Sequence, residues 1–175
     1  SEMLWRNHVD YPPHHLSRFS PKSLNKILIN NGFEVLSHFK QMSLIDLIRN
    51  FILMDLETNE QTRVFEQIWN PIEENARDIT RQKSMVSEYI RDYLTLKNKK
   101  IPNKGKVYQE FKKLYENKKD EFYHQDLEKI KSLSAHYSKL INPINEKNSI
   151  LRQELEYLNR LEINVAFPFL LQVFE

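Results

Sequence analysis

The stretch 43–53 decides the fold, because from this point apolar residues recur at helical spacing. It reads SLIDLIRNFIL. Ser43 followed by Asp46 matches a capping box, in which a hydroxyl and an acidic side chain satisfy amides at the start of a helix. The apolar residues fall on one face of that helix, which predicts a buried side and a polar side. They are Leu44, Leu47, Ile48, Phe51 and Ile52.

Similar patterns continue to the end of the chain. Thr58 with Gln61 predicts a second capping box, and Pro71 is expected to kink or restart the helix that follows. Helical spacing of apolar residues predicts further helices near 85–94, 107–115, 122–141, 151–161 and 164–175. A basic turn containing Pro102 and Gly105 separates two of them. We therefore expect residues 44–175 to form an all-α bundle of six or seven helices.

Residues 1–43 have a different pattern. Ser20 and Pro21 mark a helix start, Gly32 marks its end, and alternating residues make 33–39 the only strand candidate in the chain. The sequence thus predicts two parts, a short N-terminal loop–helix–strand appendage (1–43) and a helical domain (44–175).

The composition excludes several classes of protein. With 2 Gly and no Cys in 175 residues, the chain cannot supply a glycine-rich phosphate loop, a disulfide framework or a thiolate zinc site. The 26 basic and 24 acidic residues nearly balance, so an electrostatic role has to come from a local patch. The apolar runs are too short to span a membrane and residues 1–10 lack a signal peptide's apolar segment, so we expect a cytoplasmic protein without a membrane partner. Ser1 ahead of Met3 suggests a fragment or a tag remnant.

No residue pattern in the chain predicts catalysis. His8, His14 and His15 lie close together but lack the further ligands of a metal site, so we expect no metal and no cofactor within this chain. Glu73 and Glu74 are expected on a solvated helix face, since adjacent helical residues point in different directions. Five aromatic residues are expected in the core, with the tyrosine hydroxyls at its rim. They are Tyr89, Tyr93, Tyr108, Phe111 and Tyr115.

Two polar clusters are candidate binding surfaces. Between residues 97 and 113 there are seven lysines and one acid, a local excess of +6 that can contact nucleic-acid phosphates or can simply be a solvated turn. Asp46, Arg49 and Asn50 share a helix face that can dock on another domain or can hold a surface ion pair. The lysines predicted to contact DNA phosphates are Lys97, Lys99, Lys100 and Lys104.

From about residue 44 to the end, the chain resembles the helical region of GmrSD-type modification-dependent restriction nucleases. The resemblance implies phage defence, with DNA as the ultimate substrate and ParB-like and HNH-type domains as partners. The chain has no DGQQR motif and no HNH residues, and Ser37-His38-Phe39-Lys40 stands where the family has an Asn-x-x-Gly turn, so no catalytic residue transfers. The matching pieces are Asp46-Leu47-Ile48-Arg49-Asn50-Phe51-Ile52-Leu53, Gln61, Trp69-Asn70-Pro71-Ile72-Glu73, Tyr89-Ile90-Arg91-Asp92-Tyr93-Leu94, Ile101-Pro102-Asn103 and Val107-Tyr108-Gln109-Glu110-Phe111-Lys112.

Residues 11–36 are similar to the C-terminal tail of class I S-adenosylmethionine-dependent methyltransferases. The similarity rests on Pro12-Pro13-His14-His15-Leu16-Ser17-Arg18-Phe19-Ser20, Ser23-Leu24 and Asn31-Gly32-Phe33-Glu34-Val35. The family's glycine-rich cofactor loop lies outside this chain, so the piece alone is not expected to bind the cofactor.

Three hypotheses follow. The first is a non-catalytic helical scaffold of a GmrSD-type restriction protein, which positions a nuclease or NTPase domain and touches DNA. The second is the C-terminal part of a methyltransferase with a helical substrate-binding extension. The third is a helical protein-interaction module.

Overall fold

A computed structural model describes residues 42–119 and 122–174, and Leu44–Glu175 makes up one compact unit. The expected loop–helix–strand appendage, including the strand candidate at 33–39, lies outside the described residues. The helices are α3 (Leu44–Leu53), α4 (Thr58–Val64), α5 (Asn70–Asn75), α6 (Val86–Asn98), α7 (Val107–Tyr115), α9 (Leu127–Ile141), α10 (Ser149–Arg160) and α11 (Phe167–Phe174). Short π-helical turns span Phe65–Trp69 and Phe122–Asp126, and 3-10 turns span Lys104–Lys106, Pro143–Asn145 and Asn164–Ala166.

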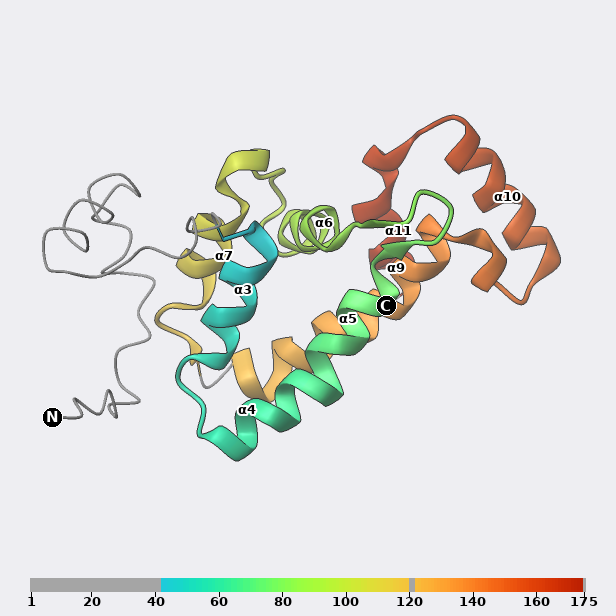
Figure 1. The fold of residues 1–175 in the computed structure, drawn as a ribbon. Coiled ribbons are helices and arrows are strands. Elements are labelled where there is room, and N and C mark those ends of the chain that lie inside the picture. The colour runs from blue at the N-terminus through green and yellow to red at the C-terminus, as the bar shows by residue number, and fades with distance from the viewer. Residues whose placement is uncertain (1–41, 120–121, 175) are drawn as a thin grey trace, which may run out of the picture. The chain divides into compact units, whose positions relative to one another are not determined.

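The helices pack around one aromatic-rich core. Figure 1 shows α4 and α5 running alongside α9, with α3 beside α7 and with α11 between α6 and α9. Because α4, the π turn after it and α5 are continuous, they count as one helical segment, and the described residues contain seven such segments. The predicted all-α bundle of six or seven helices is therefore confirmed. The largest fully buried side chains are Trp69, Tyr89, Tyr93, Tyr115, Tyr137, Phe111 and Phe122.

Pro71 explains the interruption of the long α4–α5 segment. Proline has no N–H to continue the helical hydrogen-bond ladder, and its ring crowds the preceding turn. The chain widens into the π turn Phe65–Trp69, and the Asn70 N–H bonds to the Phe65 carbonyl, five residues back. Pro71 then stands in the first turn of α5. The expected restart at Pro71 is therefore confirmed.

Two local predictions are wrong. An antiparallel hairpin pairs β1 (Arg77–Asp78) with β2 (Lys83–Ser84), two strands of two residues each. The prediction that 33–39 is the only strand candidate in the chain is therefore wrong. The hairpin escaped the sequence analysis because it is short and because Gln82, rather than glycine, takes its positive φ of 50°. Thr58 does not cap α4. Glu57 precedes the helix, and the Gln61 side chain bonds to the Leu56 carbonyl instead.

Candidate nucleic-acid interface

The predicted docking face on α3 is partly used within the helical unit itself. The Arg49 guanidinium lies 2.6 Å from the Asp46 carboxylate and reaches across to Glu73 of α5, at 3.8 Å. Glu73 also accepts a 2.9 Å hydrogen bond from the buried Trp69 indole. Asp46 and Arg49 thus come together as the spacing predicted, whereas the expectation that Glu73 is merely solvated is wrong. Asn50 lies half-buried on the same helix.

Lys97 is placed differently from the other predicted phosphate contacts. It lies in the last turn of α6, and its Nζ atom is 2.6 Å from the Asp126 carboxylate, which is buried. Tyr93 donates to the same carboxylate and also bonds to the Tyr115 hydroxyl, with 2.7 Å between the two oxygens. Lys97 therefore stands at the outer end of a row of polar groups that runs into the core. Its ion pair with Asp126 has a structural role.

The tyrosine hydroxyls lie deeper than expected. Besides the Tyr93–Tyr115 pair, the Tyr89 hydroxyl donates to the carbonyl of Ile130 in α9. Tyr89 and Tyr93 are both fully buried, and burial raises the pKa of each hydroxyl well above its ordinary value. The prediction that the hydroxyls sit at the rim is wrong for Tyr89, Tyr93 and Tyr115, because each has a hydrogen-bond partner inside the core that makes its burial tolerable, whereas Tyr108 is only partly buried.

Hydrogen bonds tie the loop after α6 to its neighbours. Lys99 ends the helix in the left-handed region, with φ of 53°. The Arg91 Nε atom then donates a 2.8 Å hydrogen bond to the carbonyl of Pro102, which is itself buried. The Asn103 side chain accepts from the Gly105 amide at 3.0 Å and so begins the turn that leads into α7. These contacts give the lysines of the loop a defined backbone.

The loop and α7 border a hollow of about 720 Å³ that is open to solvent, which we call the basic groove. Lys100 lines it from the loop, Lys106 from the 3-10 turn before α7, and Lys113 from α7 itself. Glu110 is the acidic residue of the lining. Of the predicted contacts, the structure puts Lys100 in the lining and leaves Lys99 and Lys104 exposed on the adjoining loop. The complete lining is Asn98, Lys100, Ile101, Pro102, Asn103, Lys106, Glu110, Lys113, Leu114 and Lys118.

The predicted phosphate contacts do not include Lys106 and Lys113, although the spacing along the chain indicates a shared surface. Glu110 and Lys113 lie three residues apart on one face of α7, and Lys106 lies in the turn directly before that helix. Lys118 follows after the end of the helix.

The lysines around the groove differ from most other lysines in their ion pairing. Five of them have no ion-pair partner among residues 42–119 and 122–174, namely Lys99, Lys100, Lys104, Lys106 and Lys113. Six lysines elsewhere are each paired with an acid, namely Lys83, Lys97, Lys112, Lys119, Lys131 and Lys139. The positive charge at the groove is therefore left uncompensated, which suits an anionic ligand.

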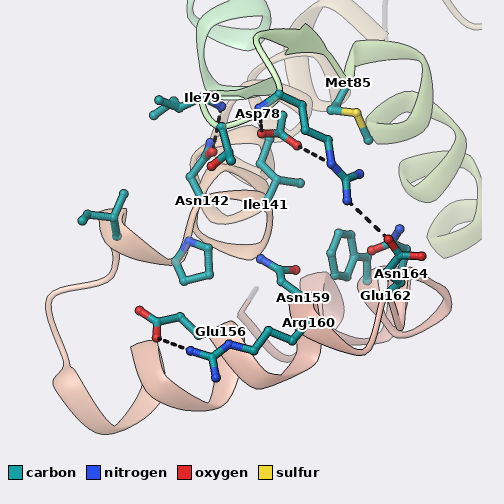
Figure 2. Close-up of a pocket in the computed structure, with 15 residues that line it drawn as sticks. Asp78, Ile79, Met85, Ile141, Asn142, Glu156, Asn159, Arg160, Glu162 and Asn164 are labelled. Carbon is teal, nitrogen blue, oxygen red and sulfur yellow. Dashed lines mark hydrogen bonds and ion pairs between the residues drawn. The ribbon is translucent and has the colours of Figure 1, made fainter.

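A second hollow, of about 550 Å³, lies between the β1–β2 hairpin and α10 (Figure 2). Its charged groups are engaged with one another: Arg81 lies 3.5 Å from Glu162, and Arg160 lies 4.0 Å from Glu156. The Asn142 amide holds the hairpin by bonding to the Ile79 amide and to the Arg77 carbonyl. This hollow has no net positive charge and is a poor candidate for a phosphate site.

His136 is the described histidine with an unusual environment. Its ring stacks on Phe174 at 5.5 Å, and its buried Nδ1 atom has no hydrogen-bond partner among the described residues. Burial, together with nearby Lys139, lowers the pKa of His136. The described ranges contain no group of three His, Cys, Asp or Glu residues placed to hold a metal ion. His8, His14 and His15 lie outside them.

No family model, no curated protein and no solved structure matches this chain. In the described part of the chain, no helix is both long and apolar enough to cross a membrane. Arg49 contacts Glu73, and Arg91 contacts Pro102. These residues support the fold and the groove, which gives them structural roles.

Proposed function

We propose that the helical unit is a non-catalytic scaffold that contacts nucleic-acid phosphates through the basic groove. The observation that carries the proposal is the concave surface on which Lys100, Lys106 and Lys113 lie without acidic partners. Lysine side chains that replace counterions on a phosphate backbone give sequence-independent, salt-sensitive binding. The rigid loop supports this function, because less conformational freedom is lost when a preorganised surface binds.

The resemblance to GmrSD-type proteins extends the proposal to a biological setting. In that setting the helical unit positions a nuclease or NTPase domain of a phage-defence protein, and the groove holds part of the DNA. The α3 face made by Asp46, Arg49 and Asn50 is the proposed contact to the neighbouring domain. Arg49 would then serve both the internal pair with Glu73 and the domain contact.

Fluorescence anisotropy with labelled DNA tests the proposal. We expect weak binding at low salt that falls steeply as salt rises, and we expect the double change Lys99→Glu with Lys100→Glu to weaken it at least about tenfold. The matched control is Lys147→Glu with Arg152→Glu, which makes the same charge change on residues outside the groove. Equal binding by both double variants and the parent would overturn the proposal.

A helical protein-interaction module is a second candidate, favoured by apolar side chains exposed on the last two helices. Phe169 and Val173 lie one turn apart on α11 and are 67% and 64% exposed. This alternative predicts no affinity for DNA at low salt. The methyltransferase alternative rests on residues 11–36, which lie outside the described residues. Calorimetric binding of S-adenosylmethionine by the full-length gene product would support it.

A further inference from the structure

We infer that the basic groove binds a single strand of nucleic acid in preference to a duplex, an inference that rests on the proposed function. The first reason is the shape of the site. Its volume of about 720 Å³ lies in the range of pockets that enclose small ligands. A duplex is a wide, stiff cylinder, so it can contact only the rim of such a concave surface. A flexible strand can enter it.

The second reason is the spacing of the groove's charges. Lys106 lies in the 3-10 turn directly before α7, and Lys113 lies seven residues further on within the helix, so the two are on the order of 10 Å apart along the helix direction. That length covers about three nucleotides at the 3.4 Å spacing of stacked bases in one strand. Lys100 lines the same groove from the loop. The cationic groups can therefore follow one short backbone segment, with a footprint of a few nucleotides.

The third reason is the mixed character of the lining. Pro102 and Leu114 provide apolar surface against which a sugar or a base can pack. The Glu110 carboxylate repels phosphates, but it accepts hydrogen bonds from N–H groups. An unpaired base exposes such N–H groups on its Watson–Crick edge, whereas a paired base has used them. The lining is therefore better matched to a strand with unpaired bases than to a duplex.

The experiment compares a fluorescently labelled single strand of about 12 nucleotides with its duplex, by anisotropy at low salt. We expect the single strand to bind at least about fivefold more tightly, with a salt slope of about −0.7 for each phosphate contacted. Lys106→Gln with Lys113→Gln should remove most of this preference. Lys147→Gln with Arg152→Gln is the matched control and should retain it. Thermal melts establish that all variants are folded.

Glu110→Gln supplies a separate measurement on the same two probes. Removing the negative charge should strengthen duplex binding, while the single strand gains less because the neutral amide oxygen is a weaker hydrogen-bond acceptor than the carboxylate. The preference for the single strand should therefore fall about two- to threefold. An unchanged preference would contradict the role given to Glu110.

The outcomes separate this inference from the proposed function. Salt-dependent binding of the duplex as tight as that of the single strand, with both weakened by the Lys106 and Lys113 changes, overturns the inference and leaves the proposed function intact. Binding of neither probe overturns both. Displacement of the strand by an equal concentration of inorganic triphosphate shows a site for small anions and overturns the inference.

Discussion

Arg91 and Pro102 are joined by a 2.8 Å hydrogen bond from the guanidinium Nε atom to the proline carbonyl oxygen. The bond ties the middle of α6 to the loop that carries Lys99 and Lys100. Arg91 points toward the protein, and through this bond it positions the loop that carries Lys99 and Lys100, the lysines proposed to contact phosphate.

Arg91→Met should loosen this loop without unfolding the helical unit. We expect faster hydrogen exchange at the amides of Gly105 and Lys106, which bond to Asn103 in the intact loop. Nucleic-acid affinity should fall several-fold while the salt slope changes by at most about one, since no phosphate contact is removed directly. Arg152→Met is the control, and an equal loss of affinity there would show that charge alone is responsible.

Glu73→Ala should destabilise the unit by about 1–3 kcal/mol, because it leaves the buried Trp69 indole N–H without its acceptor. It also removes one partner of Arg49. The neighbouring change Glu74→Ala, on an exposed side chain, should alter stability by less than about 0.5 kcal/mol. Urea unfolding of the two variants measures the difference, and equal stabilities would contradict the structural role of Glu73.

Lys97→Met and Lys100→Met should have opposite consequences. The first leaves the buried Asp126 carboxylate without its cation, so we expect a loss of about 3 kcal/mol in unfolding free energy. Binding of nucleic acid by the folded variant should hardly change. The second change should leave stability unaltered and weaken binding. Chemical denaturation and anisotropy on both variants check this, and weaker binding by folded Lys97→Met would return Lys97 to the phosphate contacts.

The Tyr93–Tyr115 hydroxyl pair should behave as a coupled unit. Tyr93→Phe and Tyr115→Phe should each cost about 1–2 kcal/mol, because a buried hydroxyl loses a partner in each case. The double variant should cost about 1 kcal/mol less than the sum of the single changes. Additive costs in a double-mutant cycle would mean that the two hydroxyls do not interact.

Asp92 should make stability depend on pH. Burial, reinforced by Glu88 and opposed by Arg91, raises the pKa of Asp92 from 3.8 to about 7. The folded protein therefore holds this proton more tightly than the unfolded chain does. The free energy of unfolding should fall by about 3–4 kcal/mol as pH rises from near 4 to 7, and this contribution should level off above that.

Asp92→Asn should lack this contribution, so its stability relative to the parent should rise between pH 4 and 7. The difference between the two proteins isolates Asp92 from other groups that titrate in the same range. Urea unfolding at several pH values measures it, with Glu154→Gln as an exposed control. A difference that is independent of pH would show that Asp92 ionises normally.

Much of the fold could be predicted from local patterns. The period of Leu44, Leu47, Ile48 and Phe51 predicted α3, and similar periods predicted the later helices, because burial of one helix face leaves a regular apolar pattern in the chain. The hairpin at 77–84 could not be predicted in this way. Its strands have two residues each, and Asn142, from the far end of α9, holds it in place.

The sequence by itself determined the all-α class, the position of the basic turn and the i,i+3 pairing of Asp46 with Arg49. These depend on residues close together in the chain, for which helical geometry is sufficient. Only the tertiary structure decided which charges are free to act. Asp126 pairs with Lys97 from another helical segment, and Glu73 of α5 pairs with Arg49 of α3. Lys113 of α7 and Lys106 of the turn before it line the groove together with Lys100 of the loop. Whether a charged side chain has a partner depends on the packing of segments that are far apart in the sequence. The spacing of residues along the chain does not predict such packing.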